Sequence, residues 1–275
     1  MRKSWGWSGA LLVLGVLGVL GVLAGCGGSG DVVVATSTRR PAPIPIATPT
    51  TLEERCKVPV EGALTRFPGP HGMSLSGAVL GEGPVVAVLL HQTASAGLCG
   101  GATYAAWLAE RGVRAVLVDF CGWGSSVCPG GTGEDWETQV GIPVEWARAQ
   151  GARRVTLVGA SLGGVVSLAV GQAAGADAIV SLSGPNRYQD LAEAGTAAAA
   201  TTVPLMVAAA PGDRDVEPQA LRAAVEGSPA RSKAYVEAPD GHGWSMLSDG
   251  MAVDPVFTPL ASTVLGWVKG DYSVP

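Results

Sequence analysis

The 275-residue sequence predicts an α/β fold: a mostly parallel, doubly wound sheet with helices on both faces. The first reason is that, from about residue 85 onward, short β-rich apolar runs alternate with stretches of helical length. Strands separated by such helices join through right-handed crossovers into a parallel sheet. The second reason is that one run, Val155–Gly159, leads directly into a glycine-flanked serine and a helix, as at the carboxyl edge of such a sheet.

The predicted elements follow in chain order. Two stretches before the alternation, 62–67 and 74–80, predict an antiparallel, hairpin-like start. Further strands are expected at 85–90, 113–119, 155–159, 178–183, 203–210 and 233–237, and helices near 104–111, 136–150, 162–173 and 188–198, with a last helix after residue 242. Pro143 is expected to kink or interrupt the helix at 136–150.

The candidate reactive residue Ser161 lies in the motif Gly159–Ala–Ser161–Leu–Gly163. Glycines two residues on either side of the serine remove Cβ atoms that would collide in a strained strand-to-helix turn. The turn would lift Ser161 to the sheet edge, where the N–H of Leu162 could stabilise a developing oxyanion. The motif alone is weak, because a chain with 40 glycines forms this spacing by chance, and an ordinary turn before a helix is the alternative.

The order of the possible catalytic partners along the chain supports the interpretation of Ser161 as a reactive serine. The histidines stand at 71, 91 and 242, and of these His242 alone follows Ser161. Between them, an apolar run ends in a turn that contains Asp213 and Asp215. Serine, acid and histidine therefore occur in the order used by one class of catalytic triad. Asp240 fits a turn residue.

Four segments, together with this order, resemble the α/β-hydrolase superfamily from about residue 60 to the end. The run that ends at His91–Gln92–Thr93 resembles the third strand and oxyanion turn of that superfamily, and the run Asp119–Phe–Cys–Gly–Trp–Gly–Ser125–Ser126 resembles the loop after its fourth strand. Gly212–Asp–Arg–Asp215 resembles the turn that carries the acid, and His242–Gly–Trp244 resembles the histidine loop.

The resemblance implies a role for each site residue. Ser161 would be the nucleophile, His242 the general base and Asp215 the acid, with Asp213 as the rival for that last role. The oxyanion would be held by the N–H of Leu162 and by that of Gln92 or Thr93. Gln92 stands where the family usually has glycine, so the choice between the last two is open. His91 is expected to be a loop-packing residue, and no cofactor or metal is implied.

The predicted strands at 178–183 and 203–210 are separated by only about twenty residues. Many α/β-hydrolases insert a cap domain there, but this length accommodates one helix. The sequence therefore predicts a hydrolase without a sizeable cap, with an open active site like that of small esterases and dienelactone-hydrolase-like enzymes.

The N-terminal residues have the pattern expected of an export signal. Arg2 and Lys3 precede an uncharged, apolar and glycine-rich run that reaches Leu23–Ala24–Gly25–Cys26. A membrane span is the alternative, since about 20 apolar residues cross a bilayer, but small residues at the end favour cleavage. The ending resembles the bacterial lipoprotein box, in which the cysteine is diacylated and becomes the first mature residue. We therefore predict a signal peptide at 1–25, a Gly/Thr/Pro-rich tether at 26–54 and the hydrolase domain at 55–275.

Four further cysteines, Cys56, Cys99, Cys121 and Cys128, make an even set in an exported domain and predict two disulfides. Cys121–Cys128 would close a short loop, which leaves Cys56–Cys99 to tie the N-terminal segment to the loop after His91. Buried free thiols are one alternative. Zinc is disfavoured, because the sequence has no C-x-x-C pair or histidine–cysteine cluster.

Charge disfavours nucleic acid as a partner. The chain has a formal charge of −5, and loss of Arg2 and Lys3 leaves 16 basic against 23 acidic residues, or −7. Trp123 and Trp244 adjoin the predicted site loops, where packing is the expected role of both. The sequence predicts an esterase held on the outer face of a bacterial membrane by an N-terminal lipid, with a small-molecule or lipid ester as substrate. A peptidase or acyltransferase on the same fold, or a non-catalytic surface lipoprotein, is the alternative.

Overall fold

Eight strands form one sheet in the computed structural model, which describes residues 49–93, 96–130, 132–248 and 254–273. Their order across the sheet is β1-β2-β4-β3-β5-β6-β7-β8. The bounds are β1 (Leu64–Pro68), β2 (Ser74–Leu80), β3 (Val85–Leu90), β4 (Arg114–Val118), β5 (Arg154–Ala160), β6 (Ala178–Leu182), β7 (Leu205–Ala209) and β8 (Lys233–Glu237).

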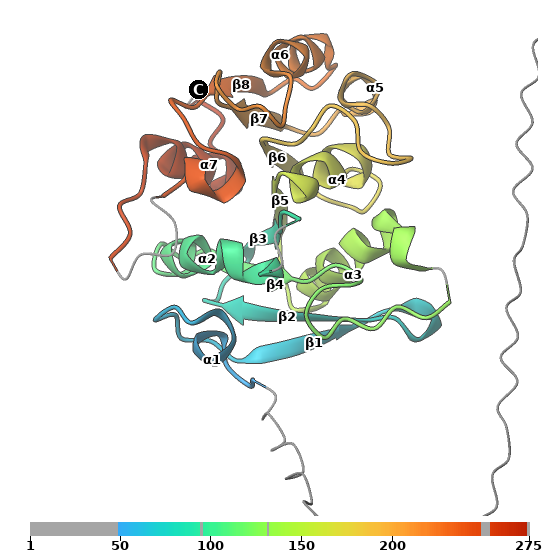
Figure 1. Ribbon diagram of the computed structural model, residues 1–275, viewed down its shortest axis with the longest axis vertical. Helices are drawn as coiled ribbons and strands as arrows, with labels where there is room; N and C mark the ends of the chain where they lie inside the picture. Colours follow the sequence, from blue (N-terminus) through green and yellow to red (C-terminus); the bar gives the residue numbers. More distant parts are fainter. Residues whose placement is uncertain (1–48, 94–95, 131, 249–253, 274–275) are drawn as a thin grey trace, which may run out of the picture. The chain divides into compact units, whose positions relative to one another are not determined.

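The sheet is antiparallel at one end and parallel elsewhere. β2 pairs antiparallel with both β1 and β4, whereas all neighbours from β4 to β8 are parallel. The predicted hairpin-like start and parallel sheet are therefore confirmed. Because all strands from β3 to β8 run the same way, the loops after them gather at one edge, which faces the viewer in Figure 1.

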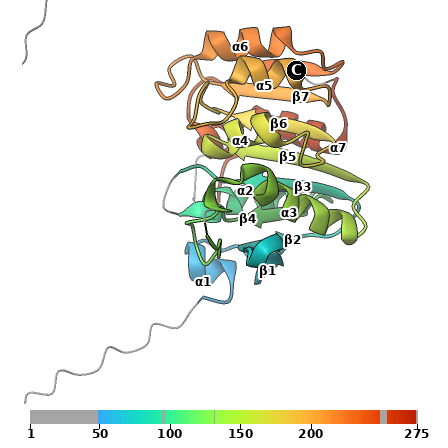
Figure 2. The same ribbon diagram turned by 90° about the vertical axis from the view of Figure 1, so that its right-hand side faces the viewer.

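Helices cover both faces of the sheet (Figure 1). On one face lie α1 (Leu52–Cys56), α2 (Ala102–Ala109) and α7 (Pro259–Lys269), and on the other lie α3 (Trp136–Ala149), α4 (Leu162–Val170), α5 (Ala194–Ala200) and α6 (Pro218–Gly227). Strand residues alternate between the two cores: Leu89 of β3 packs on the α2 and α7 side, and Val88 on the α3 and α4 side. Figure 2 shows α1 near β1 and β2, at the opposite end of the sheet from α6.

The folded part of the chain begins before residue 55. Thr51 caps α1 through a reciprocal capping box with Glu54, and Leu52 is fully buried. Residues 52–54, which we predicted to belong to the tether, are therefore part of the folded domain, and Leu52 is part of its core. The predicted signal peptide, Cys26 and the tether up to residue 48 lie outside the described residues.

The structure bears on two expectations for helices. α3 runs through Pro143 without interruption. An internal proline costs about 3 kcal/mol, and burial of Ile142, Pro143 and Val144 offsets that cost. The helix expected at 188–198 begins later, at Ala194, because Gln189 has a positive φ of 47° that an α-helix does not allow.

The connection between β6 and β7 contains α5 and no larger insertion. The prediction of a fold without a sizeable cap is therefore confirmed. Within the described part of the chain, none of the helices has the length and apolar character needed to cross a membrane.

Candidate active site

The turn between β5 and α4 holds Ser161 in a strained conformation. Its φ of 48° and ψ of −111° lie where side chains other than glycine are rare. The turn needs both flanking glycines: a Cβ on Gly159 would collide with the carbonyl of Gly163, and one on Gly163 would collide with the carbonyl of Leu90. Strain of this kind persists only where the surroundings enforce it, and it is concentrated at functional sites.

His242 and Asp213 form a hydrogen-bonded pair at the ends of β8 and β7. His242 Nδ1 lies 2.8 Å from Asp213 Oδ2, and the Asp213 side chain is only 2% exposed. The loop that carries His242 also reaches the serine turn, since an added Cβ on Gly243 would lie 3.2 Å from the Cβ of Ala160 and 3.7 Å from the backbone nitrogen of Ser161. The fold thus brings the predicted base beside the predicted nucleophile.

Asp215, which the sequence resemblance favoured as the acid, is placed differently. Its carboxylate lies 4.0 Å from His242 Nδ1 and is 78% exposed. Its backbone N–H instead donates to Asp213 Oδ1 at 3.1 Å. The geometry therefore replaces Asp215 with its rival Asp213 as the partner of His242, because the buried carboxylate makes the shorter and better-oriented contact.

The same three side chains are the best-placed group for a cation among the described residues. The nearest donor atoms of Asp213, Asp215 and His242 all lie within 4.8 Å of one another. The direct hydrogen bond between His242 and Asp213 already uses both of those groups, so the arrangement fits an acid–base pair better than a metal centre.

The hydrogen bonds around Asp213 keep it ionised. Burial by itself would raise the pKa of this carboxyl, but the hydrogen bonds with His242 and from the Asp215 N–H, together with the nearby Ser183 hydroxyl, outweigh it and lower the pKa. The sequence reasoning missed Ser183. The available signal was its position directly after β6, beside the strand that precedes Asp213.

Leu162, Gln92 and Thr93, the residues predicted to hold an oxyanion, follow the neighbouring strands β5 and β3. Leu162 is the first residue of α4, so its N–H has no acceptor within that helix. Gln92 and Thr93 follow β3, whose end is joined to the serine turn by a 3.0 Å bond from Gly163 N–H to the His91 carbonyl. The two predicted sources of oxyanion donors are thus adjacent, and the choice between Gln92 and Thr93 remains a prediction.

His91 is buried and fixes this loop. Its Nε2 accepts the N–H of Phe120 at 3.0 Å, so the hydrogen is assigned to Nδ1, which donates to the Gln92 carbonyl at 2.7 Å. Burial lowers the pKa of the imidazole, more than the Gln92 carbonyl and Asp119 raise it. The ring also packs against Phe120 and Trp123. These contacts agree with the expected packing role.

A buried ion pair stabilises the segment after His91. Asp119, which is fully buried, contacts Arg55 of α1 at 2.6 Å. Its other hydrogen bonds come from Ser76 Oγ at 2.7 Å and from Leu98 N–H at 2.9 Å. Asp119 therefore links α1, β2 and the segment after His91.

The structure contains both disulfides that the sequence predicted. Cys56–Cys99 has a Cα–Cα distance of 5.2 Å and Cys121–Cys128 one of 5.8 Å. The first bond joins the neighbours of Arg55 and Leu98, so the disulfide between α1 and the loop after β3 lies beside the Arg55–Asp119 ion pair and the hydrogen bond from Leu98 to Asp119. Trp244 packs over the same loop, where an added Cβ on Gly100 would lie 3.0 Å from its ring.

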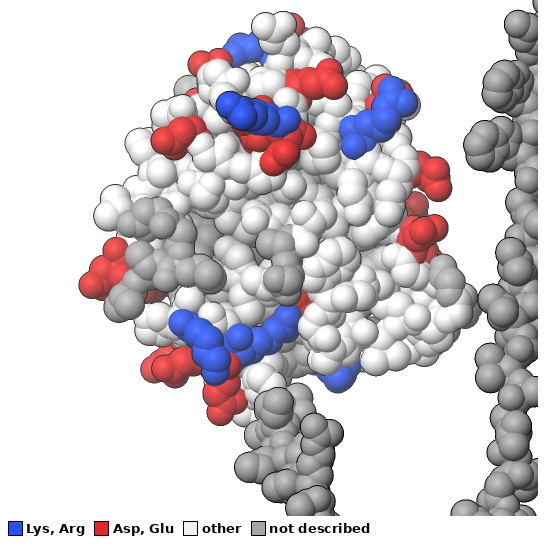
Figure 3. Space-filling view, viewed as in Figure 1, with Lys and Arg blue, Asp and Glu red and all other residues white. Residues whose placement is uncertain are grey.

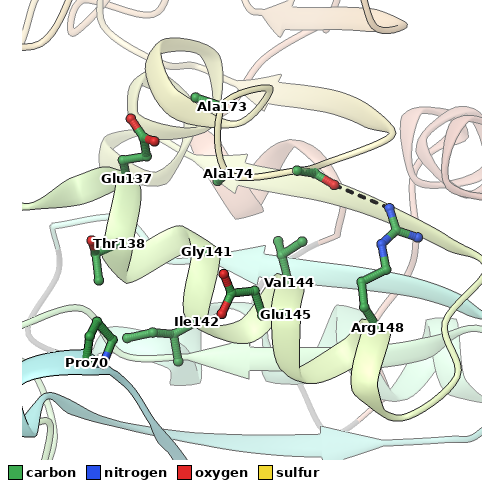
Figure 4. Close-up of a pocket in the computed structure, with 11 residues that line it drawn as sticks. Pro70, Glu137, Thr138, Gly141, Ile142, Val144, Glu145, Arg148, Ala173 and Ala174 are labelled. Atoms are coloured by element: carbon green, nitrogen blue, oxygen red, sulfur yellow. Dashed lines mark hydrogen bonds between the residues drawn. The ribbon is translucent and has the colours of Figure 1, made fainter.

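A hollow of about 550 Å³ lies elsewhere, on the α3 side (Figure 4). It is bordered by α3, Pro70 and the segment 173–175, and it contains none of the predicted site residues. Its one cation, Arg148, already binds the Gly175 carbonyl at 3.3 Å and Asp177 at 2.7 Å. This hollow is therefore separate from the candidate active site.

Comparison with known proteins identifies the fold. No family model and no curated protein matches the sequence. An esterase from Pyrococcus furiosus is similar in structure, with a TM-score of 0.62 at 13% identity over 80% of this chain and 92% of that one. A lidless α/β serine hydrolase from Xanthomonas campestris gives 0.53 at 22% identity over 78% and 95%. The ferulic acid complex of Est1E from Butyrivibrio proteoclasticus gives 0.53 at 15% identity over 75% and 96%. The chain therefore has the α/β-hydrolase fold.

Proposed function

We propose that this protein is a serine hydrolase that cleaves carboxylic esters, with Ser161 as nucleophile, His242 as general base and Asp213 as the acid. The observation that carries the proposal is the buried 2.8 Å contact between His242 and Asp213, in a loop that touches the strained Ser161 turn. If Ser161 served only to form the turn, the fold would not require a nearby histidine whose ring is held by a buried carboxylate.

The proposed reaction follows from this arrangement. His242 Nε2 removes the proton of Ser161 Oγ as the oxygen attacks the acyl carbon, and the Asp213 carboxylate stabilises the imidazolium. Backbone N–H groups of Leu162 and of Gln92 or Thr93 stabilise the oxyanion of the tetrahedral intermediate. His242 then protonates the leaving alcohol, and water releases the acid from the acyl-enzyme by the same steps in reverse.

The open sheet edge and the similar solved structures support an ester as the substrate class. The β6–β7 connection adds no cap over the site. Among the residues coloured in Figure 3, Lys, Arg, Asp and Glu side chains lie mainly toward the rim of this face. The similar solved structures include esterases, which supports ester over amide as the bond cleaved.

We further propose that the protein is exported and attached to a membrane by lipid on Cys26. The Leu-Ala-Gly-Cys sequence and the Thr- and Pro-rich segment that follows it support this localisation. A single acyl chain binds membranes only marginally, so diacylation is what would hold the protein firmly. The extended tether would allow the catalytic face to reach substrates away from the bilayer.

The test combines active-site labelling with turnover. A fluorophosphonate probe should label the wild type at Ser161, and p-nitrophenyl esters of increasing chain length should be hydrolysed. Ser161→Ala should abolish both while leaving the circular dichroism spectrum unchanged. Labelling without ester turnover, with cleavage of peptides or transfer to an added alcohol, would favour the peptidase or acyltransferase alternative. Absence of labelling and turnover in the folded wild type would favour a non-catalytic lipoprotein.

A further inference from the structure

Asp215 presents a carboxylate beside the candidate active site, although the proposed reaction gives it no role. Its side chain is 78% exposed, and its Oδ2 lies 4.0 Å from His242 Nδ1. Within the described part of the chain, no lysine or arginine forms an ion pair with this carboxylate. Asp215 therefore has the capacity to bind a further positively charged ligand next to the histidine.

Three donor atoms face one another at this point. His242 Nδ1 lies 2.8 Å from Asp213 Oδ2 and 4.0 Å from Asp215 Oδ2, and all three atoms lie within 4.8 Å of one another. Around a tetrahedral Zn²⁺ ion with bonds of about 2.0–2.2 Å, neighbouring ligand atoms are about 3.3 Å apart, so side-chain shifts of about 1 Å suffice to place all three on one ion. One imidazole nitrogen and two carboxylate oxygens suit Zn²⁺, whereas Mg²⁺ and Ca²⁺ prefer oxygen ligands.

The backbone of the turn holds the two carboxylates in place. The Asp215 N–H donates to Asp213 Oδ1 at 3.1 Å, which leaves Asp213 Oδ2 directed at His242. Hydrogen bonds of this kind orient the ligands of metal sites. Asp215 also lines a surface pocket of about 390 Å³, together with Pro185 and Glu217. A hydrated cation therefore has a path from solvent to the carboxylate.

We propose that Asp213, Asp215 and His242 form an inhibitory Zn²⁺ site. Without metal, His242 Nδ1 carries a proton and donates it to Asp213, because a carboxylate only accepts. Zn²⁺ takes the place of this proton at Nδ1, and the neutral ring then carries its proton on Nε2, so the number of protons on the ring does not change.

The consequence for the enzyme follows from the tautomer. A ring that is protonated at Nε2 and bonded to metal at Nδ1 has no lone pair to accept the proton of Ser161 Oγ, so hydrolysis stops. The inhibition rests on the proposed function, whereas the binding of Zn²⁺ does not.

Zinc inhibition of ester hydrolysis tests the proposal. With the rate of metal alone subtracted, wild-type turnover of a p-nitrophenyl ester should fall as Zn²⁺ is added, and EDTA should restore it. Mg²⁺ at the same concentration should have no effect. Asp215→Asn, compared with its own activity without metal, should raise the inhibition constant for Zn²⁺ by about 10-fold or more, since even the loss of an outer-shell partner changes metal affinity 10- to 100-fold.

Asp240→Asn is the matched control. Asp240 is also an exposed carboxylate, two residues before His242, but it is not one of the three clustered donors. This variant should keep the wild-type inhibition constant. Equal inhibition constants in wild type and Asp215→Asn would overturn the proposal, and so would equal inhibition by Mg²⁺ or an active wild type that Zn²⁺ does not inhibit.

Calorimetry measures the binding without turnover. Titration of Zn²⁺ into the metal-free, full-length protein should reveal a site that weakens in Asp215→Asn and is lost in His242→Ala, with circular dichroism to show that both variants are folded. His71→Gln should leave this site unchanged, because His71 is an exposed imidazole outside the cluster. If the wild type hydrolyses no ester, the proposed function fails, but the calorimetry still tests the zinc site. Identical titrations of wild type, Asp215→Asn and His242→Ala would overturn it.

Discussion

The ring of His242 and the carboxylate of Asp213 are joined by a 2.8 Å contact between Nδ1 and Oδ2, while Asp215, two residues farther along, stays 4.0 Å away and exposed. The two acids stand in one short turn and are chemically identical. Burial and orientation are what distinguish them, so substitutions at the two positions should have very different effects.

We predict that Asp213→Asn lowers kcat by about 10⁴-fold, the scale seen when a triad acid is made neutral in serine proteases. An asparagine there holds the wrong imidazole tautomer and does not stabilise the imidazolium. Asp215→Asn should change kcat less than about threefold. Steady-state kinetics with one p-nitrophenyl ester compares the two variants directly. A larger loss for Asp215→Asn would restore Asp215 as the acid.

The buried ion pair of Arg55 and Asp119 should matter for stability. We predict that Arg55→Met lowers the free energy of unfolding by about 3–5 kcal/mol, because it leaves the fully buried Asp119 without its counter-ion. Arg187, whose pair with Glu193 is exposed, supplies the control, and Arg187→Met should cost less than about 1 kcal/mol. Urea unfolding measures both. Equal costs in the two variants would show that the buried pair contributes nothing specific.

The two disulfides should differ in their effect on stability. In the loop-entropy description, the Cys56–Cys99 bond, which closes a 43-residue separation, is worth about 4 kcal/mol, and Cys121–Cys128, with a separation of 7, about 2.5 kcal/mol. Replacing each pair with alanines and measuring urea unfolding tests this order. Peptide mapping of the exported protein without reductant should find both bridges. Alkylation of all four cysteines under those conditions would contradict the prediction.

His91 should make stability depend on pH. Because burial lowers the pKa of the folded imidazole below its usual 6.5, the unfolded chain binds this proton first as pH falls. The free energy of unfolding should therefore decrease as the pH drops below about 6.5, until the pKa of the folded state is reached. His91→Gln should flatten this part of the profile. His71→Gln is the control, since His71 is exposed; an unchanged profile in the His91 variant would contradict the assignment.

The proposed lipid attachment at Cys26 can be tested separately. In cells that process lipoproteins, Cys26→Ser should block lipidation and release the protein from detergent-phase partitioning, because diacylation at Cys26 is the proposed anchor. Intact mass and the N-terminal sequence distinguish lipidation from cleavage by an ordinary signal peptidase and from an uncleaved span. Identical partitioning and the same unmodified N-terminus in wild type and variant would rule out the lipid anchor.

The sequence by itself determined most of the architecture. Alternation of apolar runs with helical stretches is a local property, so the parallel sheet could be predicted from spacing, and the strained Ser161 turn from spacing together with the order of its possible partners. Chain order likewise identified His242, because it alone among the histidines follows the serine. The number of cysteines likewise predicted the disulfides, because four cysteines can pair in only a few ways.

Only the tertiary structure decided whether Asp213 or Asp215 contacts His242. The two acids are two residues apart in one turn, and the sequence does not specify which carboxylate is directed inward. That choice depends on how the ends of β7 and β8 meet, which brings His242 to the Asp213 carboxylate from 29 residues farther along the chain. Burial and hydrogen-bond direction arise from packing between distant segments, so no local pattern encodes them.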